Sequence, residues 1–249
     1  MTASSLWIPY CGAAPLPAEL LARWNMDPFL FAFLTTLAAL ALPQTRGWPS
    51  RRRVTLSAAF ALIVFLYVSP FCALASALFS ARVAHHLLLV LAAAPLLATT
   101  IPEERLPGTR SLAAWTAVQA AIFWLWHAPP AYSAALSDDA VFWLMQATLL
   151  ASAAGFWAAL RSAPAPAAAA ALLATTVQMG VLGALITFAG APLYAPHKLV
   201  TLPWGMTQME DQQLAGLIMW APASAAYLIA ALWLVGRWFA GREPAAAAR

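Results

Sequence analysis

The side chains most capable of chemistry in this sequence are soft-metal ligands, because its 249 residues hold four histidines and two cysteines. Imidazole nitrogen and thiolate sulfur suit copper, and Cu(I) in particular accepts such ligands with little geometric demand. Calcium and magnesium prefer oxygen ligands and fit this inventory less well. The candidate copper ligands, if the fold gathers them, are Cys11, Cys72, His85, His86 and His127.

The elements that position these residues must lie in a membrane. The sequence is 63% apolar and 9% charged, whereas roughly one quarter of the residues of a soluble domain are charged. This composition excludes a soluble enzyme, a disulfide-rich secreted module and a disordered tail. The net charge of +4 is explained below by membrane topology, so it does not indicate nucleic acid as a partner.

Seven apolar stretches, separated by charged residues and prolines, have about the length that crosses a bilayer as a helix. We therefore predict an all-α membrane protein with seven transmembrane helices. Its expected organisation is an outer N-terminal segment over residues 1–27, a transmembrane domain over 28–240 and a cytoplasmic tail over 241–249. The expected spans cover about residues 28–42, 54–71, 82–100, 111–128, 140–160, 167–189 and 213–239.

Basic residues are distributed very unevenly between the two sets of loops that these spans define. Of the 13 basic residues, only Arg23 and Lys198 fall in one set, Arg82 lies at a helix mouth, and all the others fall in the opposite set. Cytoplasmic loops carry the excess of positive charge in membrane proteins. The sequence therefore predicts an outer N-terminus and a cytoplasmic C-terminus.

With this direction, all four histidines and both cysteines fall on the outer side. His86 and His127 lie near the outer ends of neighbouring spans, which an antiparallel hairpin brings to a similar depth, where one metal ion can bridge them. Neighbouring residues differ by about 100° around a helix axis. We therefore expect His86 to face inward and His85 to face another helix or the membrane interface.

Each candidate ligand also has a structural interpretation. A histidine near a membrane surface can hydrogen-bond a headgroup, water or a carbonyl, and this interpretation is preferred for His85 and His197. For the other two histidines both interpretations stay open. Outside the cytoplasm Cys11 and Cys72 can form a disulfide that pins the N-terminal segment to the bundle, or they can stay reduced and bind copper.

Arg82 lies one helical turn from His86 on the same helix face. Its charge would oppose a metal ion at that place, or it would hold an acidic partner such as Asp211 or a phosphate. The repulsion favours the acidic partner. Asp211 is also placed to cap the last expected helix through its backbone amides.

Four parts of the sequence resemble the polytopic cytochrome c oxidase assembly factors of the CtaG type, described for bacterial caa-type oxidases. The resemblance extends from about the first expected span to the seventh. Its most specific part is Asp-Gln-Gln beside Ala-Gly-Leu-Ile-Met-Trp. The matching strings are Phe79–Leu89 with Ala94–Leu97, Trp126–Pro129 with Tyr132, Gly183–Phe188 with Pro192–Tyr194, and Asp211–Trp220.

The resemblance implies a non-enzymatic protein of the bacterial plasma (inner) membrane that helps a haem-copper oxidase to mature by binding and delivering copper, as Cu(I), at the outer face. The implied partners are oxidase subunits, periplasmic copper chaperones and the lipid bilayer. The residues expected around the copper site or at a docking surface are Arg82, Tyr132, His197, Met209, Asp211 and Gln212.

The sequence departs from the family at Arg82, where many relatives place a second histidine four residues before the position of His86. Cys72 or Cys11 would then supply the missing ligand and make the site more selective for Cu(I). Cys72 can approach His86 only if the helix breaks after Pro70, because one continuous helix would separate them by about 21 Å.

Three other functions compete with copper delivery. The first is a redox protein in which His86 and His127 are axial haem ligands. The second is a copper transporter, which the absence of histidine and cysteine from the expected inner loops disfavours. The third is a scaffold that docks oxidase subunits without metal.

Overall fold

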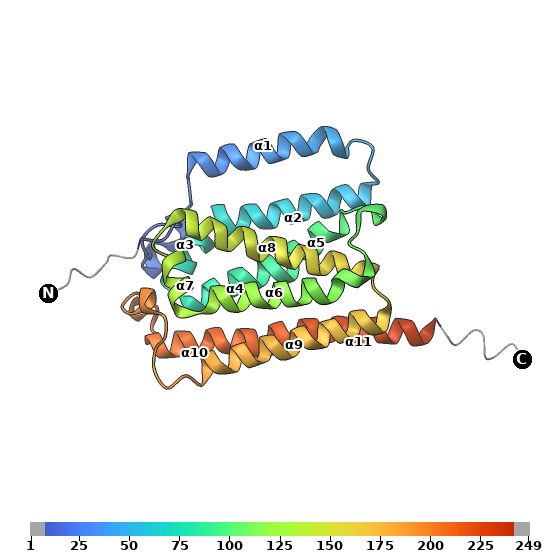
Figure 1. Cartoon of the computed structure of the whole chain (residues 1–249). Coiled ribbons are helices and arrows are strands. Elements are labelled where there is room, and N and C mark those ends of the chain that lie inside the picture. The colour runs from blue at the N-terminus through green and yellow to red at the C-terminus, as the bar shows by residue number, and fades with distance from the viewer. Residues whose placement is uncertain (1–7, 242–249) are drawn as a thin grey trace, which may run out of the picture.

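The computed structural model describes residues 8–241, which form a bundle of helices lying side by side (Figure 1). Helices account for 80% of the structure, and no strand occurs in the described residues. Residues 1–7 of the predicted outer segment and 242–249 of the predicted tail lie outside this range. The α-helices are α1 (Pro28–Thr45), α2 (Ser50–Val68), α3 (Pro70–Ala77), α4 (Phe79–Leu88), α5 (Ala94–Thr99), α6 (Leu112–His127), α7 (Pro129–Ala135), α8 (Asp139–Ser162), α9 (Ala165–Thr187), α10 (Gln208–Ile218) and α11 (Ser224–Ala240).

Five helices or continuous helical runs within residues 8–241 are long and apolar enough to cross a membrane. They are α1, α8, α9 and the runs Phe79–Thr99 and Gln208–Ala240. Together α2 and α3 form a sixth candidate, which is bent by 52°. At the place of the remaining predicted span lies α6, which has 16 residues. The all-α membrane class is confirmed, whereas seven spans and the direction of the termini stay predictions.

Prolines break the predicted pattern at two places. The second span was expected to reach residue 71, but α2 ends at Val68 because Ser69 is extended and its hydroxyl accepts a hydrogen bond from the Phe71 amide at 3.2 Å, which starts α3. The predicted loop 129–139 contains α7, because prolines at its first positions favour a helix start. Both short helices lie at the same end of the bundle (Figure 1).

Two longer runs continue through a π-helical turn each, at Leu89–Ala93 and Met219–Ala223. Pro222 lies within the second turn and Pro95 just after the first. Proline lacks the N–H that an α-helix requires, and a wider turn accommodates this loss. Near the first turn, the Val90 carbonyl accepts a hydrogen bond from the Trp157 indole at 2.8 Å, which ties this run to α8.

Glycine allows α9 and α10 to approach each other closely. A Cβ atom on Gly216 would lie 2.2 Å from Oγ1 of Thr187 and 2.6 Å from the carbonyl oxygen of Gly183. Small residues commonly permit such contacts between membrane helices. The contact explains why Gly183 and Gly216 occur in two of the sequence stretches that resemble the CtaG-type proteins. It also fixes the position of α10, which carries Asp211.

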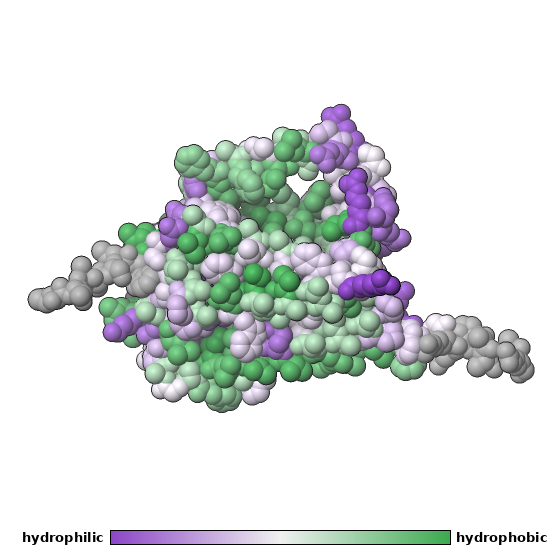
Figure 2. Space-filling model, in the orientation of Figure 1, coloured by the Kyte–Doolittle hydropathy of each residue, from purple (hydrophilic) through white to green (hydrophobic). Residues whose placement is uncertain are grey.

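The two ends of the bundle differ in their content of charged residues. The end that we call the arginine end holds the α1–α2, α5–α6 and α8–α9 connections and the end of α11 (Figure 1). Strongly hydrophilic residues gather there (Figure 2). The opposite end, which we call the histidine end, holds α3, α7 and the loop between α9 and α10. The loops are thus sorted by charge as the sequence predicts.

Candidate metal site

Helix α4 positions three of the chemically important side chains, and its start is fixed from another part of the chain. Oδ2 of Asp211 accepts a hydrogen bond from the Phe79 amide at 2.7 Å, and Oδ1 accepts from the amide and hydroxyl of Ser80 at 3.1 and 2.5 Å. The side chains of Arg82, His85 and His86 are fully buried. The cap on α4 therefore sets the depth at which these three residues lie.

His86 and His127, which we call the histidine pair, face each other in the buried core. Their ring centroids are 5.5 Å apart and their planes are nearly perpendicular, at 87°. Nδ1 of His127 donates to the Phe123 carbonyl at 2.7 Å. Nδ1 of His86 and Nε2 of His127 are buried and have no hydrogen-bond partner among the described residues. One ring nitrogen of each histidine therefore has no hydrogen-bond partner among the described residues, and Nε2 of His127 has a free lone pair because Nδ1 donates.

A buried hydrogen-bonded chain orients the His86 ring. The Tyr67 hydroxyl donates to Oε1 of Gln146 at 3.0 Å, and Nε2 of Gln146 lies 3.4 Å from Nε2 of His86. Because the Gln146 amide nitrogen donates, Nε2 of His86 accepts and the proton of the neutral ring lies on Nδ1. Ligation of a metal by Nδ1 of His86 therefore requires this proton to leave or to move to Nε2. Neither Tyr67 nor Gln146 is among the site residues that the sequence predicts, because nothing in the sequence pairs Tyr67 with α8.

His85 uses Nε2 in another contact, whereas its Nδ1 has no partner among the described residues and its ring centroid lies 6.0 Å from that of His86, so its role as a copper ligand stays a prediction. Its Nε2 contacts the Leu66 carbonyl at 3.1 Å, and its ring packs at 5.1 Å from Tyr67 and 6.0 Å from Phe71. The expected divergence of neighbouring residues around the helix axis explains this orientation.

Cys11 and Cys72 form a disulfide, which is one of the two states that the sequence leaves open. Both residues are buried. In this state their sulfurs are not thiolate ligands, so the structure does not place them in a copper site. The break before Pro70 turns Cys72 toward the N-terminal segment rather than toward a metal shared with His86.

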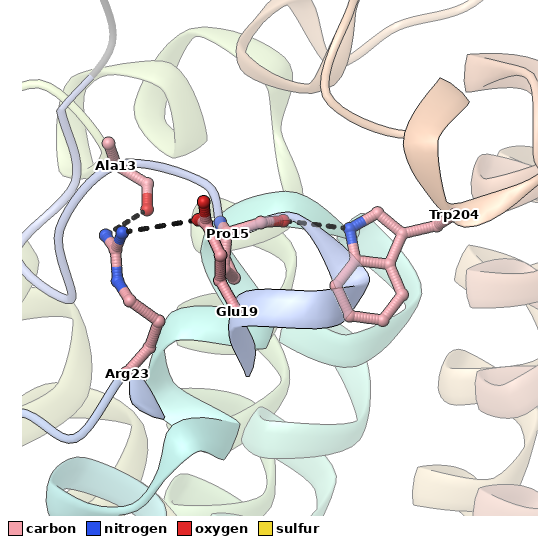
Figure 3. Close-up of polar contacts among 5 residues, drawn as sticks. All are labelled: Ala13, Pro15, Glu19, Arg23 and Trp204. Atoms are coloured by element: carbon pink, nitrogen blue, oxygen red, sulfur yellow. Dashed lines mark hydrogen bonds and ion pairs between the residues drawn. The ribbon is translucent and has the colours of Figure 1, made fainter. Parts of the chain in front are cut away.

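Two contacts within the N-terminal segment and one from the loop before α10 order this segment at the histidine end (Figure 3). Arg23 donates to the Ala13 carbonyl at 2.8 Å and lies 4.0 Å from the Glu19 carboxylate. The Trp204 indole, from the loop before α10, donates to the Pro15 carbonyl at 3.2 Å. The N-terminal segment is thus tied to the loop before α10.

His197 is fully buried, although the sequence favours an interfacial position. Its Nδ1 donates to the Ala77 carbonyl at 3.2 Å, and its Nε2 accepts a hydrogen bond from the Tyr132 hydroxyl at 2.7 Å. Burial lowers the pKa of His197 from 6.5 to about 4, the hydrogen bond to Ala77 opposes this shift, and the Arg82 charge adds to it. His197 is therefore a neutral structural link between α3 and α7.

This neutral histidine makes stability depend on pH. Below about pH 6.5 the unfolded chain is protonated at His197, whereas the folded chain stays neutral there until about pH 4. The free energy of unfolding therefore decreases as the pH falls through this window, by up to about 3 kcal/mol. His197→Gln removes the titration. We expect the free energy of unfolding of the wild type to decrease more than that of this variant when the pH is lowered from 7 to 4. A constant difference in SDS unfolding in mixed micelles would contradict the prediction.

The other expected residues have structural partners. Asp211 does not pair with Arg82 and does not cap its own helix; Thr207 and Glu210 form the capping box of α10. Gln212 accepts from the Leu193 amide at 2.7 Å and donates to the Ile186 carbonyl at 3.2 Å, which fastens the loop after α9. Met209 is half-buried in the first turn of α10.

Within residues 8–241 no group of three or more histidine, cysteine or acidic side chains is arranged to hold a metal ion. The histidine pair offers two unpaired ring nitrogen atoms, and Nδ1 of the neighbouring His85 is also unpaired. Metal–imidazole bonds are about 2 Å long, as in zinc sites, so two rings whose centroids are 5.5 Å apart are close enough to share one ion.

The fold and these contacts define a polytopic helical membrane protein with a buried pair of histidines. The sequence model of the family described as cytochrome c oxidase caa3 assembly factor (Caa3_CtaG) matches residues 31–241. The chain therefore belongs to this family, which confirms the resemblance. No curated protein and no solved structure matches the chain.

Proposed function

We propose that this member of the caa3 assembly factor family binds Cu(I) between His86 and His127 and delivers it to an oxidase subunit without catalysing a reaction. One observation carries the proposal. The two buried rings lie edge to face with their centroids 5.5 Å apart, and each ring has one nitrogen without a hydrogen-bond partner. Leaving such groups unpaired in a low-dielectric interior is costly, and a bound ion offsets the cost.

The chemistry of the pair favours copper as the cargo. Imidazole binds copper, zinc, iron and nickel, and zinc sites are usually completed by four ligands. The two nitrogen atoms available here suit Cu(I), which accepts few ligands. Arg82 lies one turn away, and its positive charge opposes a divalent ion more than a monovalent one.

The charge sorting of the loops supports delivery at the outer face of the bacterial inner membrane. The histidine end is poor in arginine, as expected of the extracytoplasmic side. The partners we propose are an oxidase subunit that receives the ion and a periplasmic copper chaperone that supplies it. Covering loops and the N-terminal segment must move for the ion to reach the buried pair.

Anaerobic Cu(I) binding tests the function. We expect wild-type protein in detergent to bind one Cu(I) in competition with bathocuproine disulfonate, and the double variant His86→Gln, His127→Gln to bind none. His85→Gln is the matched control, because it changes the adjacent histidine and is expected to keep the stoichiometry. Unchanged binding by the double variant, or none by wild type, would refute the proposal. A Soret band in the same preparation would instead indicate haem.

A further inference from the structure

Arg82 presents a buried positive charge whose hydrogen bonds are incomplete. Its side chain is fully buried, and Nε donates to the Ala75 carbonyl at 3.2 Å. Nη1 and Nη2 have no hydrogen-bond partner among the described residues. A guanidinium stays protonated in proteins, so neutralisation by proton loss does not remove the problem.

The acidic side chains within residues 8–241 either have other partners than Arg82 or are exposed. Asp211 caps α4, while Asp27 and Asp138 cap α1 and α8. The one ion pair in this part of the chain joins Arg23 to Glu19. The remaining acids are exposed, and they are Glu103, Glu104, Asp139 and Glu210. No carboxylate therefore compensates the Arg82 charge within the described fold.

The surroundings of Arg82 are aromatic and uncharged. Its guanidinium carbon lies 5.3 Å from the centroid of the Phe142 ring. The Tyr132 hydroxyl is near enough to interact with it, but this hydroxyl donates its proton to His197 and carries no formal charge. Ring faces and a neutral hydroxyl stabilise a buried cation much less than an anion does.

We propose that Arg82 binds a small monovalent anion through its unpaired Nη1 and Nη2, next to Tyr132 and Phe142. The planar fork of a guanidinium matches an anion that accepts two parallel hydrogen bonds. Because both nitrogen atoms are buried, the ligand must fit inside the protein, which limits it to the size of chloride or formate. This site is separate from the copper proposal and does not depend on it.

Thermal unfolding at constant ionic strength tests the site, with chloride replacing gluconate, which is too large to enter. A ligand that binds only the folded state raises the unfolding midpoint in a saturable way. We expect wild type to gain several degrees in chloride and in formate, and Arg82→Gln to gain nothing. We expect Arg82→Lys, which keeps the charge but loses the fork, to need about tenfold more chloride. Arg52→Gln, at the arginine end, is the matched control and is expected to respond as wild type does.

A second measurement keeps the proposal testable if Arg82→Gln does not fold. Chloride-35 NMR of wild-type protein should show excess line broadening that formate abolishes and gluconate does not. Absence of this broadening together with a flat chloride response would overturn the proposal and leave water as the partner of Arg82. A full chloride response in folded Arg82→Gln would overturn it as well. Copper binding by wild type is measured separately, so neither result decides the other.

Discussion

Replacing both Cys11 and Cys72 with alanine is expected to lower the free energy of unfolding by about 4 kcal/mol, the chain-entropy value for a loop of this length. The disulfide joins residues 61 positions apart, and it connects the N-terminal segment to α3. Without it, the unfolded chain gains freedom and the segment that covers the histidine end loses its covalent anchor. SDS unfolding in mixed micelles measures the difference.

The two single variants provide the control for this prediction. Either one alone breaks the bond, so each should lose nearly as much stability as the double variant, and dithiothreitol should have little further effect on them. Equal stability of wild type and double variant would contradict the prediction. If the folded double variant bound less than one Cu(I) per protein, the result would instead indicate that the cysteines are copper ligands.

The sequence predicts the meeting of His86 and His127 because that contact depends on simple rules. Helices alternate direction across a bilayer, loops are sorted by charge, and two neighbouring helices place residues near their outer ends at similar depth. These rules require no knowledge of packing. The structure brings the two rings together from α4 and α6, although α6 packs mainly against α8 and α9 and not against α4 as an antiparallel hairpin partner.

The same rules do not predict the short helices α3 and α7 or the contacts between distant parts of the chain. Hydropathy records the length of an apolar stretch but not the break at Ser69 or the helix that starts at Pro129. The contacts of Asp211 with Phe79 and Ser80 join residues more than a hundred positions apart, and so does the link from His197 to Ala77. A single sequence contains local capping signals but gives no indication that a side chain caps a different helix.

The contact of Asp211 with α4 leads to the second large effect. In Asp211→Ala three buried donors lose their acceptor: the amides of Phe79 and Ser80 and the Ser80 hydroxyl. An unsatisfied buried donor costs about 1–3 kcal/mol, so we expect a total loss of about 4 kcal/mol after partial relaxation. Asp211→Asn keeps one acceptor oxygen and should lose about half as much.

Glu210 offers a matched control in the same helical turn. It is exposed and belongs to the capping box of α10 rather than to the cap of α4, so Glu210→Ala should cost much less stability than Asp211→Ala. Because α4 carries His86, we also expect Asp211→Asn to weaken Cu(I) binding while Glu210→Ala leaves it unchanged. Equal unfolding free energies for Asp211→Ala and Glu210→Ala would show that the contact between α10 and α4 does not stabilise the start of α4, and the depth of His86 would need another explanation.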